Sequence, residues 1–256
     1  MFLLVAGLAR LYHCLMLAKK PTVVQWQPHE VDSPYEVLRS AQADAAAGRY
    51  ELALAKHDWF HRKMRKLEAR PYGERLSSAL AAWVKLGKAY PPALAHLTAI
   101  RDGLDKAIRG RAGGTDHFID FEAINRHVGE EKRTAQTFLW IDRHRPMIAP
   151  RVFEFALPAL IKTRQFTICS KHLDVRTAMR KAFRKWRALQ QTPWKAHADA
   201  AFARDVATAV ALFVINGRTR EANELTRMAL KQRNTPSINR TLESALAGKL
   251  PEAANA

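Results

Sequence analysis

Two stretches of the sequence combine residue types that could do chemistry. In the first, His57-Asp58-Trp59-Phe60-His61, two imidazoles stand four residues apart and a carboxylate follows the first. On a helix both rings lie on one face, as in helical zinc sites where a glutamate follows the first histidine. Aspartate is one carbon shorter than glutamate, and no third ligand stands out. The pair is a metal-binding candidate; in the competing interpretation, His57 fills an aromatic packing position and His61 lies in a polar groove.

The second stretch runs from Asp174 to Gln190 and has the pattern of a long basic helix. Its arginines recur every three or four residues, so one face would carry a continuous row of guanidinium groups able to follow phosphates. Phe183 and Trp186 would either stack on bases or join Met179 in the buried stripe of the helix. The candidate residues for binding RNA or DNA are Arg176, Arg180, Lys181, Arg184, Lys185 and Arg187.

Catalytic arrangements do not stand out in this sequence. Ser170 and Ser244 have no paired base, and Glu130 and Glu131 are adjacent, so they cannot face each other across a substrate as an acid and a base would. The glutamates are better explained as favourable charges at a helix start. We therefore expect a protein that is not an enzyme and needs no cofactor.

The net charge is the unusual feature of the composition. The 256 residues include 42 Lys and Arg against 24 Asp and Glu, which gives +18. Such a charge either attracts an anionic partner or is spread over solvated helix faces. Cys14 and Cys169 form neither a disulfide framework nor a metal-binding spacing, so we expect a reduced, cytoplasmic protein.

Helical segments separated by recurring bends organise most of the chain. Ser33-Pro34 with Glu36 predicts a capped helix start, and Gly48 predicts its end. Further bends are expected at Gly87, at Gly129, near Thr163-Arg164 and at Gly217. The intervals from Gly48 to Gly87 and from Gly87 to Gly129 are 39 and 42 residues, which is typical of stacked helical hairpins.

Three parts of the chain are expected from these patterns. Residues 1–33 would be an apolar N-terminal segment and a proline-containing linker, residues 34–247 a helical repeat domain, and residues 248–256 a disordered tail. The apolar stretch before Lys19 is short for a membrane span. Three interpretations of it stay open: a helix docked on the next unit, a membrane-surface helix, or an extension upstream of a start at Met16.

The bends carry a resemblance to the tetratricopeptide repeat. Gly48-x-Tyr50-x-x-Ala53 resembles the motif in which a glycine ends the first helix and small and aromatic residues pack the second. The chain departs from the family at His57 and Thr226, where an aromatic residue is usual, and its period exceeds the family's. Gly217 with Ala222 and Ala229, and Gly129 with Phe138 and Pro146, look like the same motif, whereas Thr134 replaces an alanine.

The resemblance implies both a fold and a function. Residues 34–235 are similar to bacterial tetratricopeptide-like proteins, which implies an all-α superhelix, or α-solenoid, of about five antiparallel hairpins. Such a protein would bind a protein or peptide partner, here an acidic one, through its concave face, with no membrane involved. The candidate groove residues on the first helix of each hairpin are Arg39, Gln42, Arg75, Ser78 and Asn125.

Overall fold

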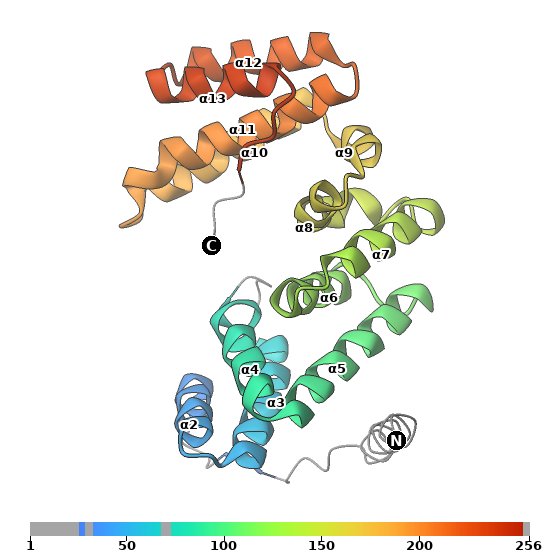
Figure 1. The fold of residues 1–256 in the computed structure, drawn as a ribbon, viewed down its shortest axis with the longest axis vertical. Coiled ribbons are helices and arrows are strands. Elements are labelled where there is room, and N and C mark those ends of the chain that lie inside the picture. The colour runs from blue at the N-terminus through green and yellow to red at the C-terminus, as the bar shows by residue number, and fades with distance from the viewer. Residues whose placement is uncertain (1–25, 29–32, 68–72, 253–256) are drawn as a thin grey trace, which may run out of the picture. The chain divides into compact units, whose positions relative to one another are not determined.

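The computed structural model describes residues 26–28, 33–67 and 73–252, and it confirms the all-α expectation (Figure 1). These residues form twelve α-helices and two short 3-10 helices, with no strand among them. No helix of the described part is long and apolar enough to cross a bilayer. The expected N-terminal helix, most of the linker and residues 253–256 of the predicted tail lie outside the described residues.

The chain divides into two compact units, residues 1–134 and 135–256. In unit 1, α2 packs against α3, and α5 packs against both α4 and α6. The predicted boundaries of the repeat domain, at residues 33 and 247, are not tested by this division. The helices of unit 1 are α2 (Pro34–Ala46), α3 (Tyr50–Leu67), η1 (Glu74–Leu76), α4 (Ser78–Ala89), α5 (Pro91–Arg109) and α6 (Thr115–Val128), and α7 (Glu131–His144) spans the division.

In unit 2, the apolar helix α11 packs against most of the other helices. Helices α9, α10, α12 and α13 all pack against it, and its side chains from Ala198 to Phe213 are mostly buried. Many of these side chains are alanines, which let neighbouring helices approach closely. The helices of unit 2 are α8 (Ala149–Lys162), α9 (Phe166–His172), α10 (Val175–Gln190), η2 (Lys195–His197), α11 (Ala198–Ile215), α12 (Thr219–Gln232) and α13 (Pro236–Leu246).

The first described helix starts as its sequence predicts. The Glu36 backbone N–H donates to Ser33 Oγ at 3.2 Å, and the Ser33 N–H donates to Glu36 Oε2 at 2.9 Å. This reciprocal capping box, with Pro34 at the first helical turn, satisfies donors that the helix itself leaves free.

Glycines in the left-handed region form three of the predicted bends. Gly48, Gly129 and Gly217 have φ of 77°, 77° and 73°, a conformation that a Cβ disfavours. The bend expected near Thr163-Arg164 is also present, with φ of 57° at Arg164. Gly248, with φ of 75°, follows α13 in the same way and was not predicted.

The predicted end of a helix at Gly87 is wrong, because α4 continues through Gly87 to Ala89. The chain turns instead at Tyr90, where φ is −133°, and α5 starts at Pro91. Gly87 lies where α4 meets α5: a Cβ built on it would stand 2.8 Å from Leu94 Cβ and 3.2 Å from the Leu94 backbone. The glycine is therefore needed for close helix packing and not for a turn.

We predict opposite effects of alanine at two helical glycines. Gly87→Ala should lower the free energy of unfolding by about 1–3 kcal/mol, because α4 and α5 must move apart to accept the methyl group. In Gly103→Ala, nothing within 4 Å meets the new Cβ, so helix propensity should raise stability by up to about 1 kcal/mol. Urea unfolding of the full chain measures both, and equal effects would contradict the packing explanation.

Candidate functional site

The basic helix α10 is held in unit 2 by the burial of one apolar side. Asp174 caps it by accepting a hydrogen bond from the Thr177 N–H at 2.8 Å. Val175, Met179 and Ala182 are buried in the hydrophobic core of unit 2, where α10 packs along α11 (Figure 1). Burial of this side fixes the rotation of the helix about its axis and so decides which side chains face solvent.

The four arginines of α10 are exposed and lie on one side of the helix. Arg176, Arg180, Arg184 and Arg187 follow one another at intervals of four, four and three residues, which keeps them within one helical face. With a rise of about 1.5 Å per residue, the row extends for roughly 16 Å along the helix axis. We call these four side chains the arginine ridge.

No carboxylate of the described residues forms an ion pair with the arginine ridge. The Arg180 guanidinium donates to Thr177 Oγ1 at 3.0 Å, and that of Arg187 lies 5.1 Å from the centre of the Phe183 ring. Asp174 stands beside the start of the ridge. Burial alone would raise the pKa of its carboxyl, but hydrogen bonds from Thr177, chiefly, lower it, so Asp174 stays charged while it caps the helix.

The two lysines of the predicted polyanion site differ from the arginines, because both are paired within unit 2. Lys181 Nζ lies 3.0 Å from Glu154 Oε2 of α8, and Lys185 Nζ donates to Asp205 Oδ2 of α11 at 2.8 Å. The structure thus places all six predicted basic residues on one helix, and of these the four arginines have no ion pair within the part of the chain that the structure describes.

The aromatic residues of α10 are engaged inside the protein. Phe183 and Trp186 stack on each other at 5.4 Å and pack against the core of unit 2. The Trp186 indole N–H donates to Asp199 Oδ1 at 2.8 Å, and the Arg233 guanidinium lies 4.8 Å from the centre of its ring. The packing interpretation of these two rings therefore describes them better than base stacking does.

The histidine pair of unit 1 surrounds a buried tryptophan. His57 stacks on Trp83 at 5.7 Å, and His61 meets the same ring edge-on at 6.0 Å. The aromatic packing position expected for His57 is present. His61 has charged neighbours, among them Arg75 and Asp120, as a polar position would, but it is 4% exposed and so lies in the interior and not in an open groove.

The polar groups near this pair do not form a metal site. His96 Nε2 lies 3.1 Å from Asp58 Oδ1, and Asp58 also pairs with Arg62. Burial alone would raise the pKa of Asp58, but the hydrogen bond with His96 and the charge of Arg62 lower it. Within the described residues, no three His, Cys, Asp or Glu side chains are placed to hold a metal ion.

Both histidines of the pair are kept neutral by their surroundings. Burial lowers the pKa of His57 to about 4, and its Nδ1 is a buried atom without a hydrogen-bond partner among the described residues. Burial, followed by the positive charge of Arg75, lowers the pKa of His61 to about 4. At neutral pH the rings act as packing groups.

The predicted groove residues separate into exposed and buried ones. Arg39 and Gln42 are exposed and three residues apart on α2, so they share a face. Ser78 is exposed at the start of α4, where its hydroxyl donates to Glu74 Oε1 at 3.2 Å.

The other two predicted groove residues lie in the interior of unit 1. Arg75 is 3% exposed and donates to Asp120 Oδ1 at 2.8 Å, which joins η1 to α6. Asn125 is fully buried; its amide donates to Thr134 Oγ1 at 3.1 Å, and its backbone carbonyl accepts from the Glu130 N–H in the bend at Gly129. Thr134, which departs from the repeat pattern, thereby helps to hold that bend.

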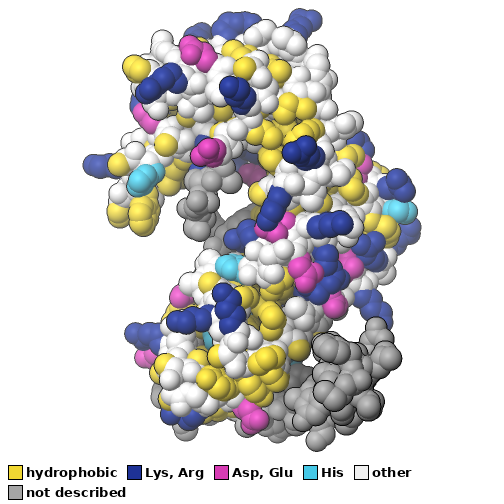
Figure 2. Space-filling model, in the orientation of Figure 1, with side chains coloured by type: hydrophobic (Ala, Val, Ile, Leu, Met, Phe, Trp, Pro, Cys, Tyr) yellow, Lys and Arg dark blue, Asp and Glu magenta, His cyan; other side chains and the backbone are white. Residues whose placement is uncertain are grey.

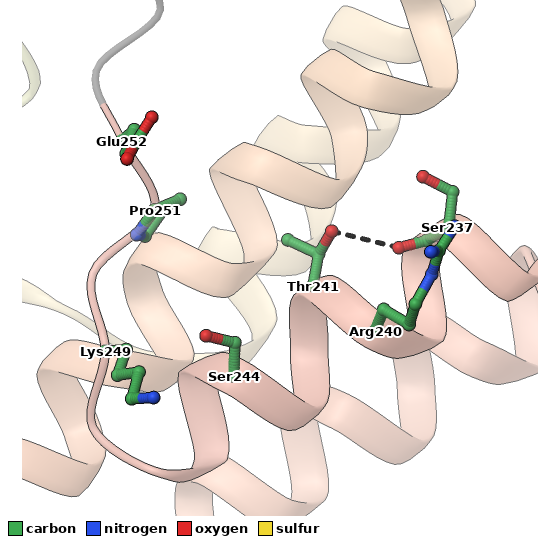
Figure 3. A pocket seen from close by; sticks show the side chains of 7 residues that line it. All are labelled: Ser237, Arg240, Thr241, Ser244, Lys249, Pro251 and Glu252. Carbon is green, nitrogen blue, oxygen red and sulfur yellow. Dashed lines mark hydrogen bonds between the residues drawn. The ribbon is translucent and has the colours of Figure 1, made fainter.

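A shallow pocket in unit 2 lies between α13 and the segment that follows it (Figure 3). Thr241 Oγ1 donates to the Ser237 backbone oxygen at 2.9 Å, and Ser237 and Ser244 are exposed residues. None of the described residues that line the pocket is a histidine, so its serines have no imidazole base beside them. The lining residues are Ser237, Arg240, Thr241, Ser244, Lys249, Pro251 and Glu252.

Sequence reasoning missed two exposed aromatic residues, Tyr35 at 48% and Trp194. Trp194 follows α10 in the turn before η2 and is 64% exposed. The signal was present, because Trp194 stands between Pro193 and Lys195, and the residues at helical spacing from it are Gln190, Gln191, His197 and the small Ala198.

Comparison of the chain with protein-family models, with curated proteins and with solved structures gave no match. The function is therefore inferred from the chain's own residues.

We predict that unit 1 loses stability on acidification through its buried histidines. Since the pKa of His57 is about 4 when folded and about 6.5 when unfolded, the unfolded chain binds more protons between these values. Stability should fall as the pH falls from 6.5 to 4, by about 3 kcal/mol for this histidine. Urea unfolding at a series of pH values measures the loss.

Two variants test the origin of this pH dependence. His57→Phe keeps a ring against Trp83 and removes both the titration and the unpartnered Nδ1, so the pH dependence should become shallower. His144→Phe changes an exposed histidine and serves as the control. An unchanged slope in His57→Phe would show that other groups cause the acid sensitivity.

Proposed function

We propose that this chain is a non-catalytic, cytoplasmic binding module that holds the phosphate backbone of a nucleic acid on the arginine ridge of α10. The observation that supports the proposal most directly is the exposure of four arginines on one helix face without an ion-paired carboxylate among the described residues. Arginine offers a planar fork of donors that matches phosphate oxygens, and it stays charged at every physiological pH.

The dimensions of the ridge suit a row of phosphates. A DNA strand advances about 3.4 Å along the duplex axis per phosphate, so a ridge of roughly 16 Å faces about five of them. Unit 2 also contains 21 of the 42 Lys and Arg residues but only 9 of the 24 Asp and Glu, so this unit as a whole is positively charged and would attract a polyanion.

An acidic protein is supported less well at this surface. The core of a protein interface is normally apolar, and aromatic anchors contribute much of its energy. On α10 the aromatic rings, Phe183 and Trp186, pack against the core of unit 2, so the outward side of the helix is dominated by charged groups. A surface of this kind suits sequence-independent, salt-dependent binding of a phosphate backbone.

A protein partner is proposed separately for unit 1, in line with the resemblance to tetratricopeptide repeats. We propose that α2 and α3 form an antiparallel hairpin of that kind, with a peptide lying on the exposed side of α2. The supporting observation is that Tyr35, 48% exposed, shares a helix face with Arg39 and Gln42. An exposed aromatic beside two polar donors can anchor a peptide, which the buried Arg75 and Asn125 cannot do.

We predict that charge reversal on the ridge abolishes most of the nucleic-acid affinity. In Arg180→Glu/Arg184→Glu/Arg187→Glu, binding of a fluorescent oligonucleotide should weaken at least tenfold. The dependence of log K on log salt should become shallower by about 2, because each lost phosphate contact removes about 0.7 from the slope for a single strand. Fluorescence anisotropy at several salt concentrations measures both.

A matched variant separates the ridge from the total charge. Lys63→Glu/Lys85→Glu/Lys88→Glu makes the same change of net charge on exposed residues of unit 1. It should reduce affinity far less. Equal losses of affinity in the two variants would contradict a site on α10. If the unaltered chain binds poly-glutamate but not DNA, the proposed nucleic-acid ligand is wrong and an acidic protein is the partner.

A further inference from the structure

We infer that Trp194 is a stacking platform for a base of single-stranded nucleic acid, placed where the arginine ridge ends. The inference rests on the proposed function, because the ridge must hold the phosphates that bring a base to this ring. It adds a preference that the ridge alone does not have, namely for strands whose bases are not already stacked within a duplex.

The position of Trp194 follows from the end of α10. The last arginine of the ridge, Arg187, precedes Trp194 by seven residues, and the chain closes α10 with a hydrogen bond from the Thr192 N–H to the Leu189 oxygen at 3.0 Å. The η2 helix, which begins directly after Trp194, contacts both α10 and α11. Trp194 therefore lies at the end of unit 2 where α10, and with it the arginine ridge, ends.

The backbone around Trp194 is held by hydrogen bonds. Its N–H donates to Thr192 Oγ1 at 3.2 Å, and its carbonyl accepts from the His197 N–H at 2.9 Å. The neighbouring Lys195 N–H donates to the Thr192 carbonyl at 3.2 Å. A ring carried on a fixed turn loses little conformational freedom on binding, which favours a stacking role over a loose surface position.

Exposure distinguishes Trp194 from the tryptophan that sequence reasoning considered for stacking. Trp186 is occupied by Phe183, Asp199 and Arg233, whereas the ring of Trp194 makes a tilted contact with His197 at 6.1 Å. Burying an indole surface of this size against a base would be favourable. Nothing within the described part of the protein covers it.

The charge around Trp194 suits an anionic strand. Arg184, Arg187 and Lys195 are exposed on or beside this end of α10. The nearby Asp199 stays ionised, because hydrogen bonds from Arg233 and Trp186 lower the pKa of its carboxyl, but the ion pair with Arg233 offsets its charge. Figure 2 shows hydrophobic, histidine and basic side chains gathered where α10 is joined to α11.

The test compares strands that share phosphates but differ in bases. The probes are a fluorescent oligothymidylate of about 16 nucleotides and an abasic strand of the same length, each measured by anisotropy at the same salt concentration. The unaltered chain should bind the oligothymidylate about tenfold more tightly than the abasic strand. Trp194→Ala should remove this difference, and Trp194→Phe should restore much of it.

Further variants show whether a negative result contradicts base stacking on Trp194 or phosphate binding on the ridge. Met147→Ala truncates another exposed apolar side chain and should leave the preference for thymidylate intact. The charge-reversed ridge should lose affinity for both strands. If the unaltered chain binds both strands equally, or if Trp194→Ala weakens both to the same degree, base stacking is wrong and phosphate binding stands; if it binds neither strand, both proposals are wrong.

Discussion

The burial of α11 is the constraint on which unit 2 depends. This helix packs against α9, α10, α12 and α13, and the last three turn apolar faces toward it in one hydrophobic core. A charged side chain cannot enter such a core without a partner, because desolvation of an unpaired ion costs several kcal/mol. The basic residues of α10 are therefore confined to the outer part of that helix, and the arginine ridge is a consequence of how the core is packed.

Sequence patterns predicted much of the local structure because they report short-range physics. Gly48, Gly129 and Gly217 stand at bends since the left-handed conformation favours glycine, and Ser33 caps α2 through atoms only three residues away. Gly87 shows the limit of this reasoning. Its role depends on a contact with Leu94 on the next helix, and this contact cannot be predicted from the residues of α4 alone.

The candidate sites were predictable to a smaller degree, for a related reason. The six basic residues of α10 could be placed on one helix from their spacing, but whether each is paired depends on Glu154 and Asp205, which are distant in sequence. Arg75 has the composition of a surface residue, but its ion pair with Asp120 of α6, 45 positions away, lets it lie in the interior. Burial and pairing are tertiary properties, and helical periodicity alone does not give them.

The ion pairs of Lys181 and Lys185 have a further consequence for the ridge. One anchors α10 to Glu154 on α8 and the other to Asp205 on α11, while the apolar side of the helix packs into the core. A helix held by charge and by packing keeps its rotation about its own axis before any ligand arrives. When a ligand binds, the loss of conformational entropy then comes mainly from the arginine side chains, because the helix that carries them is already fixed.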